Sequence, residues 1–148
     1  MASEQRFEKL NQHDLAEIEV RRALVRSWIA HNPDLVRALD TIAGRLLFID
    51  SVISQQLLSA EMVYEWQCLG IIFGDALADR LGLEWQVVEE EGFRDPCLVA
   101  PGTTIVLFPM TMLSKRIEQG DNIDLHHFFD GLCEQVTAMR KGGAFDME

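Results

Sequence analysis

The spacing of apolar residues changes at Gly82, and this change limits the folds open to the chain. Before it, apolar side chains recur at intervals of three and four, which predicts a helix from Ser59 to about Leu81 with a left-handed cap at Gly82. After it, the segment EWQVVEEE (84–91) alternates between apolar and polar residues, as a half-exposed strand does. We therefore expect helices before Gly82 and strands directly after it.

Two further helices are predicted upstream. One covers residues 14–31, with Val20, Leu24 and Trp28 on its inner side, and the pair Asn32 and Pro33 ends it and begins the next. The next helix carries a seam of apolar residues at alternating spacings of four and three, namely Leu35, Leu39, Ile42, Leu46, Ile49 and Ile53. Such a seam indicates an internal helical layer, and a homodimer through the Leu35 to Ile53 helix is the alternative.

Short apolar segments separated by turns follow the strand. Gly92 to Asp95 is predicted to be a turn, CLVA (97–100) and TIVLF (104–108) are predicted strands, and APGT (100–103) between them suits a type II turn. Pro109 starts a short helix that ends at Gly120, and a last helix stops at Gly142. The predicted class is α+β, with an N-terminal helical layer packed on a three-stranded antiparallel β-meander and followed by two C-terminal helices, in the order α-α-α-β-β-β-α-α.

The 148 residues suit one domain, 1–148, with a helical N-terminal half (1–58) and an α+β part (59–148). Residues 96–114 carry no charge, but Pro96, Pro101 and Pro109 interrupt them, so we do not expect a membrane span. The N-terminus is charged throughout and lacks the apolar stretch of a secretion signal. These features predict a cytoplasmic protein.

Acidic residues are concentrated in the second part of the chain. The net charge is −11; residues 1–58 hold 8 acids and 7 bases, and residues 59–148 hold 16 acids and 6 bases. Binding to nucleic acid or to an anionic membrane needs clustered Lys and Arg, so this distribution argues against both. A basic protein partner fits the distribution, and the alternative is that the charge only keeps the chain soluble.

Two surface sites are candidates for binding. Backbone donors at the start of the helix at Pro109, with Thr111, Lys115 and Arg116, could hold a small anion, although the same side chains also suit a solvated helix face. The densest acidic cluster is a candidate docking patch for a basic partner and consists of Glu89, Glu90, Glu91 and Asp95. Use of that cluster for acid and base catalysis would need a desolvated carboxylate, which a charged turn does not provide.

No residue is assigned to catalysis, to a metal or to a cofactor. The stripe His126, Asp130 and Glu134 lacks the ligand spacing of strong zinc motifs. The three cysteines lie in apolar surroundings, which favours buried, reduced thiols over nucleophiles or a disulfide framework. The signatures GxSxG, GxxxxGK[ST], GxGxxG, HExxH and paired CxxC are all absent from the sequence.

Three phrases resemble a family of small bacterial domains of unknown function. They are LGIIFGDALADRLGLEW, RDPCLVAPGT and FPMTMLSKRIEQGDNIDL, between about Trp66 and Val136. The resemblance depends on a GxxxGD helix (Gly70, Gly74 and Asp75), the Trp85 strand, the PGT turn and the FPxTMxxKRxE segment. It implies a compact α+β domain without assigned activity or catalytic residues.

The sequence as a whole favours a non-catalytic protein-binding module, because the acidic residues are concentrated in one part of the chain and the sequence contains no recognisable catalytic motif. A narrower form of this hypothesis is an immunity protein that neutralises a basic toxin. The alternative is a regulatory domain that binds a small anion or metabolite, and an enzyme of unknown type comes third.

Overall fold

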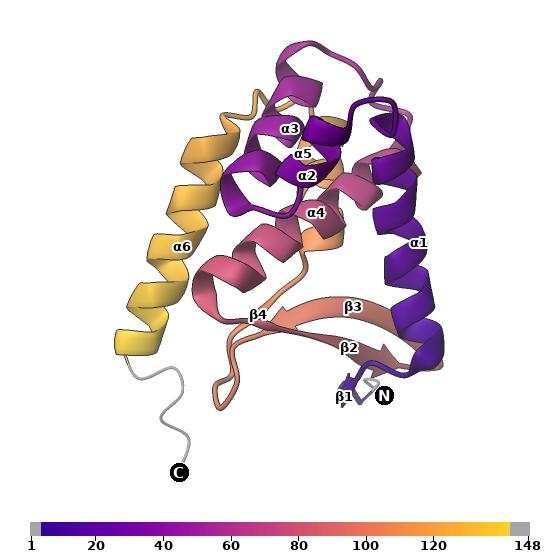
Figure 1. The fold of residues 1–148 in the computed structure, drawn as a ribbon. Helices are drawn as coiled ribbons and strands as arrows, with labels where there is room; N and C mark the ends of the chain where they lie inside the picture. The colour runs from indigo at the N-terminus through magenta and orange to yellow at the C-terminus, as the bar shows by residue number, and fades with distance from the viewer. Residues whose placement is uncertain (1–3, 143–148) are drawn as a thin grey trace.

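The computed structural model describes residues 4–142 and combines helices with one antiparallel sheet (Figure 1). The elements in chain order are β1 (Arg6–Lys9), α1 (Gln12–Trp28), α2 (Pro33–Ala38), α3 (Ile42–Ser54), α4 (Val63–Leu81), β2 (Glu84–Glu90), β3 (Phe93–Val99), β4 (Val106–Leu107), α5 (Pro109–Glu118) and α6 (Leu125–Lys141). The predicted α+β class, with helices before and after the strands, is confirmed. Within residues 4–142, no helix has both the length and the apolar character needed to cross a membrane.

The sheet has four strands in the order β1-β2-β3-β4, one more than predicted. The added strand is β1, which pairs with β2 so that Arg6 lies opposite Glu89 and Lys9 lies opposite Gln86. Its sequence RFEK is short and mostly charged, so it lacks the apolar alternation by which strands are recognised. Short, charged strands are typical of sheet edges, where they discourage pairing with other chains.

The turn between β2 and β3 is tighter than predicted. Two residues form it, Glu91 and Gly92, with φ of 52° and 84°, as in the hairpin turns that match strand twist. β3 therefore already begins at Phe93, and the prediction of a turn from Gly92 to Asp95 is wrong. The type II turn before β4 was predicted correctly: Gly102 has φ of 76°, and the Thr103 N–H donates to the Ala100 carbonyl at 3.1 Å.

Pro96 lies inside β3, at a position where a strand can accommodate proline. The Ala100 N–H donates to Ile105 at 3.1 Å, across the edge of β3 that faces β4. Alternate residues direct their backbone groups to the same edge, so the Pro96 nitrogen also faces this side. β4 pairs only with Leu98 and Val99, so the nitrogen without a hydrogen lies where the edge has no partner strand.

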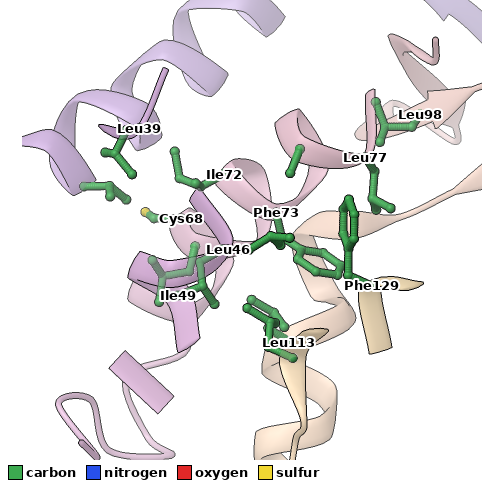
Figure 2. Close-up of a cluster of buried hydrophobic side chains, with 14 of the residues drawn as sticks. Leu39, Leu46, Ile49, Cys68, Ile72, Phe73, Leu77, Leu98, Leu113 and Phe129 are labelled. Atoms are coloured by element: carbon green, nitrogen blue, oxygen red, sulfur yellow. The ribbon is translucent and has the colours of Figure 1, made fainter. Parts of the chain in front are cut away.

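Helix α4 is the centre of the fold and lies between α1 and α6 above the sheet (Figure 1). Figure 2 shows its buried side chains among those of α3, α5 and α6. Phe73 is fully buried and contacts Phe129 edge-on, with 5.8 Å between ring centroids. The left-handed cap at Gly82 is confirmed (φ of 67°), and Arg140 of α6 donates to the Leu81 carbonyl at 2.6 Å.

The start of α4 differs from the prediction. The helix begins at Val63, and its N-cap Met62 forms no side-chain capping bond. Ser59 does not cap it, since the Ser59 carbonyl instead accepts the indole N–H of Trp66 at 2.9 Å. A buried tryptophan thus ties down the preceding loop, because its ring nitrogen needs a partner.

The predicted helix from Leu35 to Ile53 is also wrong, because the chain breaks it into α2 and α3. Thr41 caps α3 by accepting the Gly44 N–H at 2.9 Å. A Cβ on Gly44 would lie 1.9 Å from the Ala38 carbonyl oxygen, so only glycine permits this tight corner. Leu39, Leu46 and Ile49 of the seam are buried within this chain, whereas Leu47 is exposed. A homodimer through this region stays a prediction.

Candidate functional site

A groove of about 490 Å³ lies between α1 and the β2–β3 hairpin and is closed at one end by Met110 of α5. Helix α1 contributes Asp14, Glu17, Ile18 and Arg21 to its lining. The hairpin contributes Val87, Phe93, Arg94 and Asp95. The groove thus lies where α1 meets the sheet, and it is lined by both apolar and charged side chains.

The apolar part of the groove has a buried and an exposed section. Ile18 and Val87 are buried, with 2% and 1% of their surface exposed. Phe93 is 72% exposed, more than any other large apolar residue within residues 4–142. The tight turn at Gly92 places this ring at the start of β3, where it stands in solvent beside the groove.

Arg94 connects the groove to two other elements. Its guanidinium donates to both carboxylate oxygens of Asp14, at 3.1 and 2.8 Å, and to Glu8 of β1 at 2.7 Å. Asp14 is buried and belongs to a capping box, in which it exchanges hydrogen bonds with Asn11 at the start of α1. The bonds from Arg94 and the Asn11 N–H hold the pKa of Asp14 below its usual value although burial opposes this, and the two acids raise the pKa of Arg94.

Arg21 occupies the opposite wall on α1. One of its terminal nitrogens donates to the Glu17 carbonyl at 2.9 Å and to the Glu17 carboxylate at 3.3 Å. Its guanidinium also lies over the ring of Tyr64, 5.3 Å from the centroid. Its buried Nε has no hydrogen-bond partner among residues 4–142. The cation is therefore held in place by one acid and one aromatic ring.

The charges of the groove leave an excess of acid. Arg94 is shared between Asp14 and Glu8, and Arg21 is paired with Glu17. Asp95 is exposed at the rim, and no cation of the described chain lies within ion-pairing distance of it. The edge of the groove therefore offers an unpaired carboxylate next to an exposed aromatic ring, since Asp95 and Phe93 project from the same face of β3.

The structure places the members of the predicted acidic patch on different surfaces. Glu89 pairs with Arg6 at 2.6 Å and accepts the Gly92 N–H at 3.2 Å. Glu90 faces the opposite side of the pleated sheet and accepts a bond from Gln5 at 2.9 Å. Glu91 forms the turn with its φ of 52°. Asp95 lies opposite Val88, so it faces the same side of the sheet as Glu90 and reaches the groove at its edge.

The predicted anion site at the start of α5 is also divided. Carbonyl oxygens of Pro109 and Met110 pack so close to α4 that a Cβ on Gly70 would lie 2.6 Å from each. Thr111 is half-buried near this contact, and Lys115 is exposed. Arg116 instead extends toward α6, where its guanidinium lies 4.1 Å from the centroid of the Phe128 ring. The structure therefore directs Arg116 to a second groove, which Thr111 and Lys115 do not line.

The remaining candidate metal ligands do not converge on one point, and the remaining candidate nucleophiles are buried away from solvent. His126, Asp130 and Glu134 are all exposed, and in the described part of the chain no three His, Cys, Asp or Glu residues are placed to hold a metal ion. The thiols of Cys68, Cys97 and Cys133 are buried. Burial raises the pKa of each, and that of Cys97 reaches about 11. These thiols are protonated near neutral pH, which makes them poor nucleophiles.

Sequence reasoning missed the groove because its key residues are charged side chains that face inward. Arg94, Asp14 and Glu8 were not singled out, since their partners are about 80 residues apart in the chain. One local signal was available: Asn11 followed by Asp14 has the spacing of a capping box, which marks both the helix start and an inward-facing acid.

Comparisons with known proteins agree on the fold and leave activity open. Residues 46–129 match a family model described as a domain of unknown function, DUF3806. This match confirms the resemblance inferred from sequence. No curated protein matches the chain.

A crystal structure from Bacteroides thetaiotaomicron resembles this fold, with a TM-score of 0.66 and 16% sequence identity. The similarity covers 88% of this chain and 48% of the other, so the present chain spans about half of that protein's length. At this identity the likeness shows the fold alone.

Proposed function

This chain belongs to the DUF3806 family of domains of unknown function, and since the family supplies no activity, we propose from the geometry that it is a non-catalytic protein-binding module. In this proposal the groove between α1 and the β2–β3 hairpin docks a basic segment of a partner protein. The matched region includes the whole hairpin, whereas α1 lies outside it.

The observation that carries the proposal is that Phe93 and Asp95, two residues apart on β3, project from the same face of the strand at the edge of the groove. Phe93 is 72% exposed, and Asp95 has no ion-pair partner in the described chain. A Lys or Arg side chain suits both, because its stem or its cation can lie against the ring while its charge meets the carboxylate. Ile18 and Val87, inside the groove, offer apolar surface to a neighbouring side chain of the partner.

The charge of the whole chain supports a basic partner. The sequence holds 24 acids and 13 bases, which gives a net charge of −11. A field of one sign raises the rate at which an oppositely charged protein is encountered, and salt weakens this effect. An immunity protein that neutralises a basic toxin is the narrowest version of the proposal.

Catalysis in this groove fits the geometry less well. The lowered pKa of Asp14 keeps this acid ionised near neutral pH, so it cannot act as a general acid. His13 is exposed, and its ring nitrogen lies 4.0 Å from the Glu17 carboxylate, which is too long for a hydrogen bond that would orient a base.

Affinity capture from the cell extract in which the chain is native tests the proposal. The wild-type chain should retain a basic protein at low salt and release it at about 0.5 M salt, where exposed charges are screened. The double variant Phe93→Ser, Asp95→Asn should lose that protein. Its matched control, Phe108→Ser with Asp121→Asn, changes an exposed phenylalanine and an exposed aspartate away from the groove and should retain it. Equal retention by both variants would contradict the proposed site.

A further inference from the structure

We infer that the groove between α5 and α6 is a second binding site, for a small organic monocarboxylate whose apolar body lies against α6. The groove has a volume of about 480 Å³ and shares no lining residue with the groove at the hairpin. Arg116 supplies the positive charge, Phe128 and Leu132 supply apolar surface, and Gly131 supplies space.

Arg116 contacts an aromatic ring that is packed against the core of the protein. Its guanidinium lies 4.1 Å from the centroid of the Phe128 ring. That ring is stacked on fully buried Phe73, with 5.5 Å between centroids and 9° between planes. The N–H donors of a guanidinium lie in its own plane, so a contact with the face of a ring does not use them up.

Arg116 also forms no ion pair with an acidic side chain, in contrast to most arginines within residues 4–142. Within residues 4–142, six arginines form ion pairs and Arg116 forms none: the six are Arg6, Arg21, Arg22, Arg37, Arg45 and Arg94. A rigid guanidinium with free donors matches a carboxylate, which can accept two parallel N–H bonds. A chain with a net charge of −11 could have supplied an internal acid here.

Gly131 supports a site at this place independently of Arg116. It lies in the middle of α6 and lines the groove, and a Cβ added to it would meet no atom within 4 Å. Glycine weakens a helix interior relative to alanine, and here no contact within the described chain requires it. The missing side chain leaves the α6 backbone open to close approach, as at many ligand sites. Phe128 and Leu132, both half-buried, flank this opening.

The polar residues of the groove define the charge of the ligand. Asp124 lines the groove as well, and one of its oxygens accepts the His127 N–H at 3.2 Å, which caps α6. This nearby negative charge disfavours a doubly charged phosphate more than a monocarboxylate. Asn122 and Gln135 provide amide groups that can donate to the same ligand.

A titration followed by NMR tests the inference with three probes: 3-phenylpropionate, its neutral amide and inorganic phosphate. We expect 3-phenylpropionate to shift the amide signals of Gly131 and His127 in a saturable way. The neutral amide should bind at least about tenfold more weakly, because the charge-assisted bonds to Arg116 are lost. Phosphate should leave these signals unchanged at about 10 mM.

Two variants and one control separate binding from folding. Arg116→Gln should lower the affinity for 3-phenylpropionate about tenfold, whereas Lys115→Gln, one residue away and equally exposed, should not change it. Gly131→Ala should also lower the affinity, yet raise the melting temperature, because alanine favours the helix and meets no neighbour. Weaker binding in a more stable protein cannot come from unfolding.

Any one of three results would overturn the inference: no saturable shift with 3-phenylpropionate, equal binding of acid and amide, or unchanged affinity in Arg116→Gln. None of these results depends on the groove at the hairpin, so the two proposals stand or fall separately.

Discussion

Asp75 joins three elements of the fold through one carboxylate. It lies on α4, accepts two hydrogen bonds from Arg22 of α1 at 2.9 and 2.7 Å, and accepts the indole N–H of Trp85 from β2 at 3.0 Å. The side chains of Asp75 and Arg22 are 15% and 19% exposed, so water replaces these bonds poorly when they break. Within the GxxxGD segment, the aspartate is therefore a structural anchor.

Replacing Asp75 by asparagine should lower the free energy of unfolding by about 2–4 kcal/mol, because Arg22 loses its mostly buried acid, keeps only the exposed Glu19, and the carboxylate that also accepts from Trp85 is replaced by an amide. Urea denaturation measures the change. Asp79→Asn is the matched control on the same helix: its partner is Arg45 at 2.6 Å, but Asp79 is 54% exposed. This control should change stability by less than about 1 kcal/mol. Equal effects of the two substitutions would refute the anchoring role.

The pair of Asp14 and Arg94 should make stability depend on pH. The bonds from Arg94 hold the pKa of Asp14 below its ordinary value in the folded state. An acid with a lowered pKa stabilises the fold fully above its unfolded pKa, and this contribution is lost as the pH falls through the folded pKa.

Asp14→Asn should therefore cost roughly 2 kcal/mol at pH 7 and progressively less below about pH 4. Urea titrations of both proteins at pH 7, 5 and 3.5 measure this difference. In an Arg94→Met background the dependence should shrink, since the main cause of the shift is gone. A difference that stays constant down to pH 3.5 would contradict the assignment.

At the scale of elements, two glycines of α4 allow neighbouring elements to pack directly against the helix backbone. A Cβ on Gly70 would lie 2.6 Å from carbonyl oxygens at the start of α5, and one on Gly74 would lie 2.6 Å from the Trp85 ring. These glycines lie one turn apart on α4, and α5 and β2 are the elements that approach them. The contacts are to backbone and to a held ring, which cannot move aside cheaply.

Gly70→Ala should destabilise the protein by about 1–3 kcal/mol, because the added methyl pushes α5 away from α4. Gly131→Ala, also in a helix interior, should stabilise it by about 0.5–1 kcal/mol. Thermal unfolding of both variants measures the opposite signs. A stabilising Gly70→Ala would show that α5 does not pack against α4 as described.

Local signals predicted those elements whose ends depend on a few neighbouring residues. Gly82 ended α4, Pro101 and Gly102 formed the turn before β4, and Pro109 began α5, each through backbone preferences of glycine or proline. β1 and the break at Thr41 were missed, because one depends on a strand 80 residues away and the other on a tight contact at Gly44.

The inner side of α1 was misjudged for a related reason. Val20 was placed inward but is 56% exposed, whereas Asp14 is buried. Apolar periodicity does not register an inward-facing charge, and the partner of Asp14 is Arg94, distant in sequence. The groove at the hairpin was hidden from sequence reasoning by the same long-range pairing. Arg116 was singled out with Thr111 and Lys115, but its side chain extends toward Phe128 of α6, and a role in binding stays a prediction.

At the scale of the whole molecule, the family match and the core have different limits. The match ends at Phe129, within α6, and begins at Leu46, within α3. The main hydrophobic core also contains Val25 of α1, Ile29 at the C-cap of α1 and Val136 of α6, all outside that range. Segments on both sides of the matched region therefore complete one core around α4.

We propose on this ground that residues 1–148 fold as a single domain and that the fragment 46–129 does not fold alone. The fragment lacks β1, which covers the edge of β2, and lacks α1, which holds Asp75 and shields α4. The full chain should unfold in one cooperative transition, whereas the fragment should show poor dispersion of amide NMR signals and no sharp melting. A fragment with sharp melting and native-like dispersion would mean that α1 and β1 are additions to a smaller, self-sufficient core. The Asp75→Asn substitution would then destabilise the attachment of α1 without unfolding α4, a distinction that hydrogen exchange of the α4 amides resolves.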